Sequence, residues 1–256
     1  MSAPAPFARR LQEADRCLIG TWVKIPSLET VEILALAGFD YVVIDQEHAP
    51  LDFGFVYSAI VVAQGLGMSA FVRVPNGSGS HYQRLLDSGV DGILVPHVSS
   101  AAEAAHAVSG MTFPPEGERG MGLTSRAGQW GRRSAADYVA RGADLFRAVQ
   151  LEDTASLDDA PGILATPGLD GIFIGMGDLR LSTGLSGDDP GLRGRVDAVL
   201  EAAGRSGIPV GTAVGGPAEF QAAAARSFSY VMVSNDTGML ANESARMVRE
   251  SLAARD

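Results

Sequence analysis

Short apolar runs alternate with longer segments of helical pattern from one end of the chain to the other. The runs are rich in Val, Ile and aromatic residues, and strands that alternate with helices are typical of β-α units in a parallel sheet. The pattern predicts eight strands, at 18–25, 41–45, 69–74, 92–96, 146–152, 171–175, 208–214 and 230–235.

The segments between these strands carry helix signals. One of them opens with Ser27 as a candidate N-cap, has Glu29 in its first turn and ends at Gly38. Segments 101–108 and 190–206 are further predicted helices. Residues 111–135 form a Gly-rich piece longer than an ordinary loop, so we expect it to be functional or mobile.

Periodicity alone allows either a closed barrel or an open, doubly wound sheet. Eight strands in 256 residues favour the (β/α)8 barrel, which typically takes about 250 residues. Because no repeat or linker interrupts the pattern, we expect residues 1–256 to form a single TIM-barrel domain of the α/β class.

Composition limits the classes of molecule that the protein is expected to bind. The formal net charge is −10, which opposes binding to nucleic acid or to an anionic membrane, since both are held through clustered basic side chains. Cys17 is the single cysteine, the first residues carry no apolar leader, and no apolar run is long enough to span a membrane. These features predict a cytoplasmic protein that acts on small molecules. Among its 20 basic residues only Lys24 is a lysine.

Polar residues gather where the predicted strands end. In a barrel these carboxyl ends meet at one rim, which is where TIM barrels carry their chemistry. The second, third, fifth and sixth strands each contribute, with Asp45, Gln46, Glu47 and His48, then Arg73, then Gln150 and Glu152, then Gly177 and Asp178.

Oxygen ligands on two strands suit a hard divalent cation such as Mg²⁺ or Mn²⁺. Glu152 and Asp178 are the candidate ligands, and the backbone amides near Gly177 could hold a substrate carboxylate at a helix start. His48 beside Asp45 is a candidate base with an orienting carboxylate. Arg73 offers a permanent charge for an oxygen that becomes negative.

Simpler roles compete with these. Asp178 could cap a helix, and Glu47 is expected to be structural. The histidines without a carboxylate neighbour in sequence are expected on the surface or in packing. Trp22 and Phe71 are expected to line the lumen, and Trp22 is also counted among the candidate substrate contacts. The histidines without a carboxylate neighbour in sequence are His81, His97 and His106.

Five motifs, in order along the chain, resemble the 4-hydroxy-2-oxoheptanedioate aldolases, which are metal-dependent class II pyruvate aldolases. They are G-F-D-Y-V-V-I-D-Q-E-H-A-P, F-V-R-V-P, P-P-E-G-E-R-G, V-Q-L-E and I-F-I-G-M-G-D-L. The resemblance implies a divalent metal (Mg²⁺, Mn²⁺ or Co²⁺) on Glu152 and Asp178. It also implies Arg73 on the keto oxygen of the donor and an acid/base pair of His48 and Asp45.

The resemblance further implies that Gln150 and the amides of Gly177 and Asp178 hold the donor carboxylate, and that Asp87 approaches a neighbouring subunit's site. It implies a homohexamer, a trimer of dimers, whose C-terminal helix swaps between subunits. The chain departs from the family pattern near the donor and acceptor pockets, so the substrates stay open. These departures are Gln46, Thr112, Met176, Gly177 and Arg180.

The expected activity is a reversible aldol reaction between a 2-oxoacid of pyruvate or hydroxypyruvate type and an aldehyde, through a metal-stabilised enolate. One alternative is a Schiff-base mechanism on Lys24, at the end of the first strand. Others are a decarboxylase or acyl-CoA lyase of the same lineage, and a barrel that only binds a 2-oxoacid.

Overall fold

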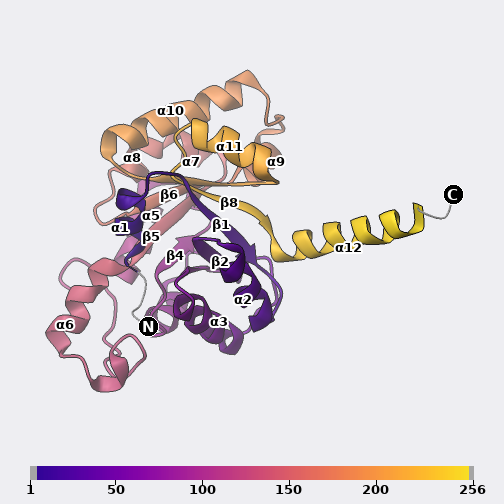
Figure 1. Cartoon of the computed structure of the whole chain (residues 1–256). Coiled ribbons are helices and arrows are strands. Elements are labelled where there is room, and N and C mark those ends of the chain that lie inside the picture. The colour runs from indigo at the N-terminus through magenta and orange to yellow at the C-terminus, as the bar shows by residue number, and fades with distance from the viewer. Residues whose placement is uncertain (1–4, 254–256) are drawn as a thin grey trace.

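The eight predicted strands form one closed, all-parallel barrel in chain order (Figure 1). The computed structural model describes residues 5–253, apart from the side chain of Ser80. Pairing of β1 with β8 closes the sheet, so the predicted (β/α)8 barrel is confirmed. The strands are β1 Leu18–Val23, β2 Tyr41–Asp45, β3 Ser69–Arg73, β4 Gly92–Val95, β5 Phe146–Leu151, β6 Gly171–Ile174, β7 Val210–Val214 and β8 Tyr230–Asn235.

Helices cover the outside of the barrel. The predicted start of α2 is confirmed, because the Ser27 side chain accepts the Thr30 N–H and Gly38 ends the helix with φ 95°. The helices are α1 Phe7–Glu13, α2 Leu28–Ala37, α3 Phe53–Gly65, α4 Tyr82–Asp87, α5 Ala101–Met111, α6 Ala135–Ala140, α7 Thr154–Asp158, α8 Ala160–Leu164, α9 Met176–Thr183, α10 Pro190–Ser206, α11 Pro217–Ala225 and α12 Asp236–Ala253, with short 3₁₀ turns η1 Gly79–His81, η2 Gln129–Gly131 and η3 Arg141–Asp144.

Aromatic side chains fill the lumen. Phe7 on α1 enters it from the amino-terminal end, where its ring centroid lies 4.7 Å from that of Phe71 and 5.1 Å from that of Phe146. Space for these rings depends on glycine, because a Cβ on Gly92 would lie 2.2 Å from the Phe71 ring. The lumen is therefore a packed core, separate from the aliphatic layer between strands and helices.

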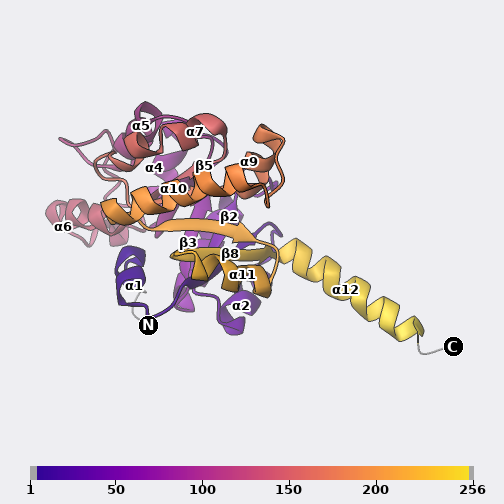
Figure 2. The same ribbon diagram turned by 90° about the horizontal axis from the view of Figure 1, so that it is seen from above.

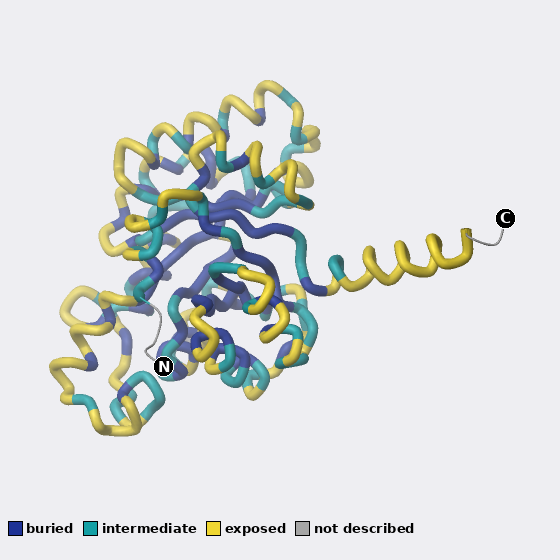
Figure 3. Tube along the Cα trace, viewed as in Figure 1, coloured by how far each residue is buried: buried dark blue, intermediate teal, exposed yellow. Residues whose placement is uncertain are grey.

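Two parts stand out from the barrel. The segment between α5 and β5 forms a lobe with η2, α6 and η3, and α12 projects away from the strands (Figures 1 and 2). Most of α12 is exposed, in contrast to the buried strands (Figure 3). The swap of this helix between subunits stays a prediction.

Among the described residues, no helix is long and apolar enough to cross a membrane. The cytoplasmic location stays a prediction.

Candidate active site

The centre of the carboxyl-terminal rim is an ion pair between neighbouring strands. Asp45 and Arg73 are register partners at the ends of β2 and β3. Arg73 donates from Nε to Asp45 Oδ1 at 3.0 Å and from Nη2 to Oδ2 at 2.8 Å, and both residues are buried. This two-bond geometry fixes the plane of the guanidinium.

Lys24 completes this pair from β1. Its Nζ lies 2.9 Å from Asp45 Oδ2. Burial raises the pKa of Asp45, but the hydrogen bonds and charges of Arg73 and Lys24 outweigh it and leave that pKa below its ordinary value. Lys24 is thus engaged as the ion-pair partner of a buried carboxylate, a role that disfavours the Schiff-base alternative.

Among the described residues, the Asp45 carboxylate makes no hydrogen bond or ion pair with the His48 imidazole, so this predicted contact is wrong. Asp45 Oδ1 instead accepts the backbone N–H groups of Glu47 at 3.2 Å and His48 at 3.3 Å. The imidazole is half exposed, with Nε2 3.7 Å from Glu47 Oε2. The reason is that Asp45 points inward at the end of β2, where Arg73 and Lys24 take up its oxygens.

Glu47 is more central than the sequence suggested. It is largely buried, and its Oε2 lies 2.8 Å from Arg73 Nη1. Its Oε1 lies 2.7 Å from His97 Nε2. Glu47 therefore links the arginine to a histidine that follows β4.

Sequence reasoning missed His97, which was expected on the surface or in packing. It follows β4 with a φ of 57°, a conformation that non-glycine residues seldom adopt. Its Nδ1 lies 2.5 Å from Glu152 Oε1, and its backbone N–H donates to the same oxygen at 2.7 Å. The signal in the sequence is its place at the carboxyl end of a strand; its carboxylate partners, Glu47 and Glu152, are distant in sequence.

Glu152 and Gln150 come from β5 and share one face, as the two-residue period predicts. Gln150 Nε2 donates to Glu152 Oε2, and both side chains are buried. Gly175, just past β6, makes room for them, because a Cβ there would lie 2.9 Å from Gln150 Nε2 and 3.0 Å from Glu152 Cβ.

Negative charge accumulates around Glu152. Burial raises its pKa, His97 lowers it, and the charges of Glu47 and Asp178 raise it again, with a net rise. Asp178 is half-buried in the first turn of α9, and Gly177 beside it is exposed. The site therefore holds carboxylates that lack enough positive charge to balance them.

This donor set fits a hard divalent cation. Glu152, just past β5, and Asp178, in the first turn of α9, offer oxygen ligands, and their unbalanced charge would be neutralised by a cation. Within residues 5–253 no group of three or more His, Cys, Asp or Glu side chains has metal-binding geometry. A metal here would therefore take its remaining ligands from solvent and substrate, as Mg²⁺ commonly does.

The other candidates lie below the rim or away from it. Trp22 is buried in the lumen, with Arg73 Cζ 4.1 Å from its ring centroid. Asp87 ends α4 toward the amino-terminal face, where it accepts from Tyr138 Oη at 2.9 Å and Gln83 Nε2 at 3.0 Å. Trp22 thus supports Arg73, and the described residues do not place Asp87 among the rim carboxylates.

A closed barrel with an arginine and several carboxylates at its carboxyl-terminal rim defines an α/β-barrel enzyme. The profile of the HpcH/HpaI aldolase/citrate lyase family matches residues 18–242. The chain belongs to this family.

Relatives agree with this assignment. The chain is 32% identical over 237 residues to a 5-keto-4-deoxy-D-glucarate aldolase of Shigella dysenteriae, covering 91% of this chain and 92% of the relative. It is similar to the crystal structure of a family member from Burkholderia cenocepacia, with a TM-score of 0.89, 33% identity and coverage of 96% and 98%. A second crystal structure, an HpcH/HpaI aldolase from Desulfitobacterium hafniense, matches with a TM-score of 0.88, 30% identity and coverage of 94% and 95%. The chain is thus a carbon–carbon lyase of the aldolase type.

Proposed function

We propose that this enzyme catalyses reversible aldol addition and cleavage between a 2-oxoacid donor, of pyruvate or hydroxypyruvate type, and an aldehyde. The observation that carries the proposal is the acidic cluster around Glu152, which Glu47 and His97 link to the fixed guanidinium of Arg73. Such a pairing suits a substrate that is an anion when it binds and gains charge on its keto oxygen when it reacts.

Glu152 and Asp178 are the residues that would hold a divalent cation, of which Mg²⁺, Mn²⁺ and Co²⁺ are the candidates. A cation bound there would supply Lewis-acid polarisation of the donor's keto group. Gln150 orients Glu152 by hydrogen bonding to it, which fixes one ligand before the metal arrives.

Arg73 stabilises the donor as charge moves onto its keto oxygen. Its Nη1 and Nη2 each have a second N–H beyond those given to Glu47 and Asp45, so the group can donate without leaving its place. The N-terminal amides of α9, around Gly177 and Asp178, face this end of the barrel and suit the donor carboxylate. Together they orient the donor and its reacting carbon.

His48 moves the proton at C3 of the donor or at the aldehyde-derived hydroxyl. Its imidazole is exposed at the rim and can therefore reach a bound substrate. Glu47 replaces Asp45 as the nearest carboxylate to the imidazole, while Asp45 acts through Arg73. Removal of such a base typically lowers the rate about 10²–10⁴-fold.

The assembly in this proposal is a homohexamer, built as a trimer of dimers. Exposed apolar side chains on α12, at Leu240, Met247 and Val248, support contact with another subunit through this helix. In such an assembly Asp87 would approach a neighbouring site, in keeping with its separation from the rim of its own chain.

The test is exchange of the C3 protons of pyruvate and of hydroxypyruvate in D₂O, followed by NMR with added Mn²⁺ or Mg²⁺ and after EDTA. We expect metal-dependent exchange that Glu152→Ala abolishes. Glu201→Ala, a change of the same kind on the exposed surface of α10, should leave it unchanged. Exchange that survives EDTA and Glu152→Ala, or a borohydride-trapped adduct at Lys24, would refute the proposal.

A further inference from the structure

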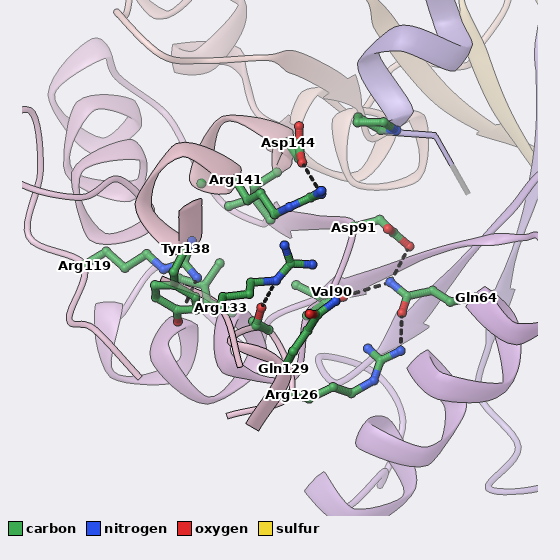
Figure 4. A pocket seen from close by; sticks show the side chains of 16 residues that line it. Gln64, Val90, Asp91, Arg119, Arg126, Gln129, Arg133, Tyr138, Arg141 and Asp144 are labelled. Atoms are coloured by element: carbon green, nitrogen blue, oxygen red, sulfur yellow. Dashed lines mark hydrogen bonds and ion pairs between the residues drawn. The ribbon is translucent and has the colours of Figure 1, made fainter. Parts of the chain in front are cut away.

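A polar cavity lies at the amino-terminal end of the barrel, opposite the rim that carries the candidate active site. Its volume is about 400 Å³, and its lining includes Pro6, Asp91 and Leu145, which come directly before α1, β4 and β5. Four arginines from the lobe between α5 and β5 also line it, namely Arg119, Arg126, Arg133 and Arg141. Figure 4 shows their side chains approaching this space from different parts of the lobe.

Arg119 is a buried charge without a directly paired counter-ion, and the Asp87 carboxylate reaches it only through Tyr138, which donates to Asp87 Oδ1 at 2.9 Å. Arg119 is 7% exposed, and no described carboxylate lies within ion-pair distance of it. Its guanidinium stacks 4.2 Å from the Phe113 ring centroid, Nη2 donates to Tyr138 Oη at 3.4 Å, and Nε is buried without a partner. Gly142 also lines the cavity, and Arg119 Nη1 lies 3.7 Å from the position that a Cβ on Gly142 would take. The guanidinium of Arg119 therefore borders the cavity. Such a group is strongly destabilising unless an anion neutralises it.

Arg126 is also held by neutral acceptors alone. Its Nη1 donates to the Ser88 carbonyl at 2.8 Å and its Nη2 to Gln64 Oε1 at 2.7 Å. Gln64 in turn donates to Asp91, which also accepts the Ala70 N–H. These bonds fix the guanidinium in advance of any ligand.

The other two arginines of the lining are paired with carboxylates. Arg133 pairs with Asp137, and Arg141 pairs with Asp144 and lies near Asp137. Arg119 and Arg126 are therefore the two guanidiniums of the lining that have no carboxylate within ion-pair distance among the described residues.

We propose that this cavity binds a small dianion, a phosphate monoester or a dicarboxylate, between Arg119 and Arg126. Guanidinium groups form paired hydrogen bonds with phosphate and carboxylate oxygens, and volumes of a few hundred cubic ångströms are typical of small-molecule sites. Within one chain this cavity lies at the opposite end of the barrel from the acidic rim, and its anion binding does not require the reaction proposed there.

The experiment is isothermal titration of the full chain, purified without phosphate, with inorganic phosphate and separately with malonate. We expect one saturable site per chain for at least one anion, and the preferred anion identifies the class. Arg126→Gln and Arg119→Gln should each weaken binding about tenfold or more. Arg205→Gln, on exposed α10, should leave it unchanged.

Circular dichroism reports whether each variant folds. If Arg119→Gln folds poorly, Arg126→Gln decides the test, because Arg126 is less buried and its replacement disturbs the fold less. No saturable heat with either anion would overturn the inference. Binding that both lobe variants leave intact, or that Arg205→Gln weakens equally, would also overturn it.

Discussion

At the scale of single residues, Asp45 is the acceptor on which the rim depends. It takes two hydrogen bonds from Arg73, an ion pair from Lys24 and two backbone N–H groups at the start of the β2–α3 turn. A buried carboxylate with so many donors fixes the position of Arg73 before substrate arrives. Its contribution to catalysis is therefore one of positioning.

We predict that Asp45→Asn lowers the free energy of unfolding by about 3–5 kcal/mol at pH 7, because Lys24 would lose its buried counter-ion and Arg73 one of its two. The pKa of Asp45 is lowered in the folded protein. The Asp45 carboxylate therefore stabilises the fold above its ordinary pKa of about 3.9, and this stabilisation is lost as the pH falls through the folded pKa. Urea unfolding from pH 7 downward measures this.

The matched control is Asp52→Asn, which changes an exposed carboxylate that caps α3. Its loss should be limited to that of an N-cap, about 1 kcal/mol or less. An Asp45→Asn protein as stable at pH 7 as the unchanged chain would contradict the prediction.

At the scale of elements, the strands were predictable because each is a compact apolar run, but their ends were set by distant partners. The first strand was expected to reach residue 25 and ends at Val23. The N–H groups of Lys24 and Ile25 donate to the Asp236 carboxylate in place of a strand neighbour. No local pattern around the first strand contains that information.

The same limit applies to the site. Rim positions such as Arg73 and Glu152 followed from strand ends, since parallel strands bring these ends together. The contacts of His97 with Glu47 and Glu152 join three different strand ends. Pairings of this kind depend on barrel closure, which sequence spacing does not encode.

The lumen supplies a prediction for an element. We expect Gly92→Ala in β4 to lower the free energy of unfolding by about 1–3 kcal/mol, because the new Cβ would overlap the Phe71 ring. Gly194→Ala on α10 has open space around it and should be neutral or raise stability by about 0.5–1 kcal/mol. Thermal or urea unfolding of the two variants compares them directly, and equal losses would argue against the packing explanation.

At the scale of the whole molecule, α12 has too little contact with its own barrel to explain its apolar side chains. Met247 is 56% exposed and Val248 is 61% exposed, although the helix is anchored at its start by buried Asp236. A helix that carries adjacent apolar residues so far from the core is expected to pack on another subunit.

We predict that Met247→Asp combined with Val248→Asp lowers the molar mass of the assembly, measured by light scattering during size exclusion. Circular dichroism should stay unchanged, since these side chains leave the barrel core intact. Ser251→Asp, a charge added to the same helix, serves as the control and should keep the assembly. An unchanged mass in the double variant would show that α12 does not hold subunits together.

Closure of the barrel between β1 and β8 also bears on how the protein emerges during synthesis. The partner of Leu18 is Tyr230 at the start of β8, so the second edge of the first strand stays unpaired until the last strand of the barrel has been made. Until then the growing chain carries an open, apolar sheet edge, the kind of surface that promotes aggregation and engages chaperones. Slower translation of the final third would lengthen this exposed period more than a delay anywhere after β8.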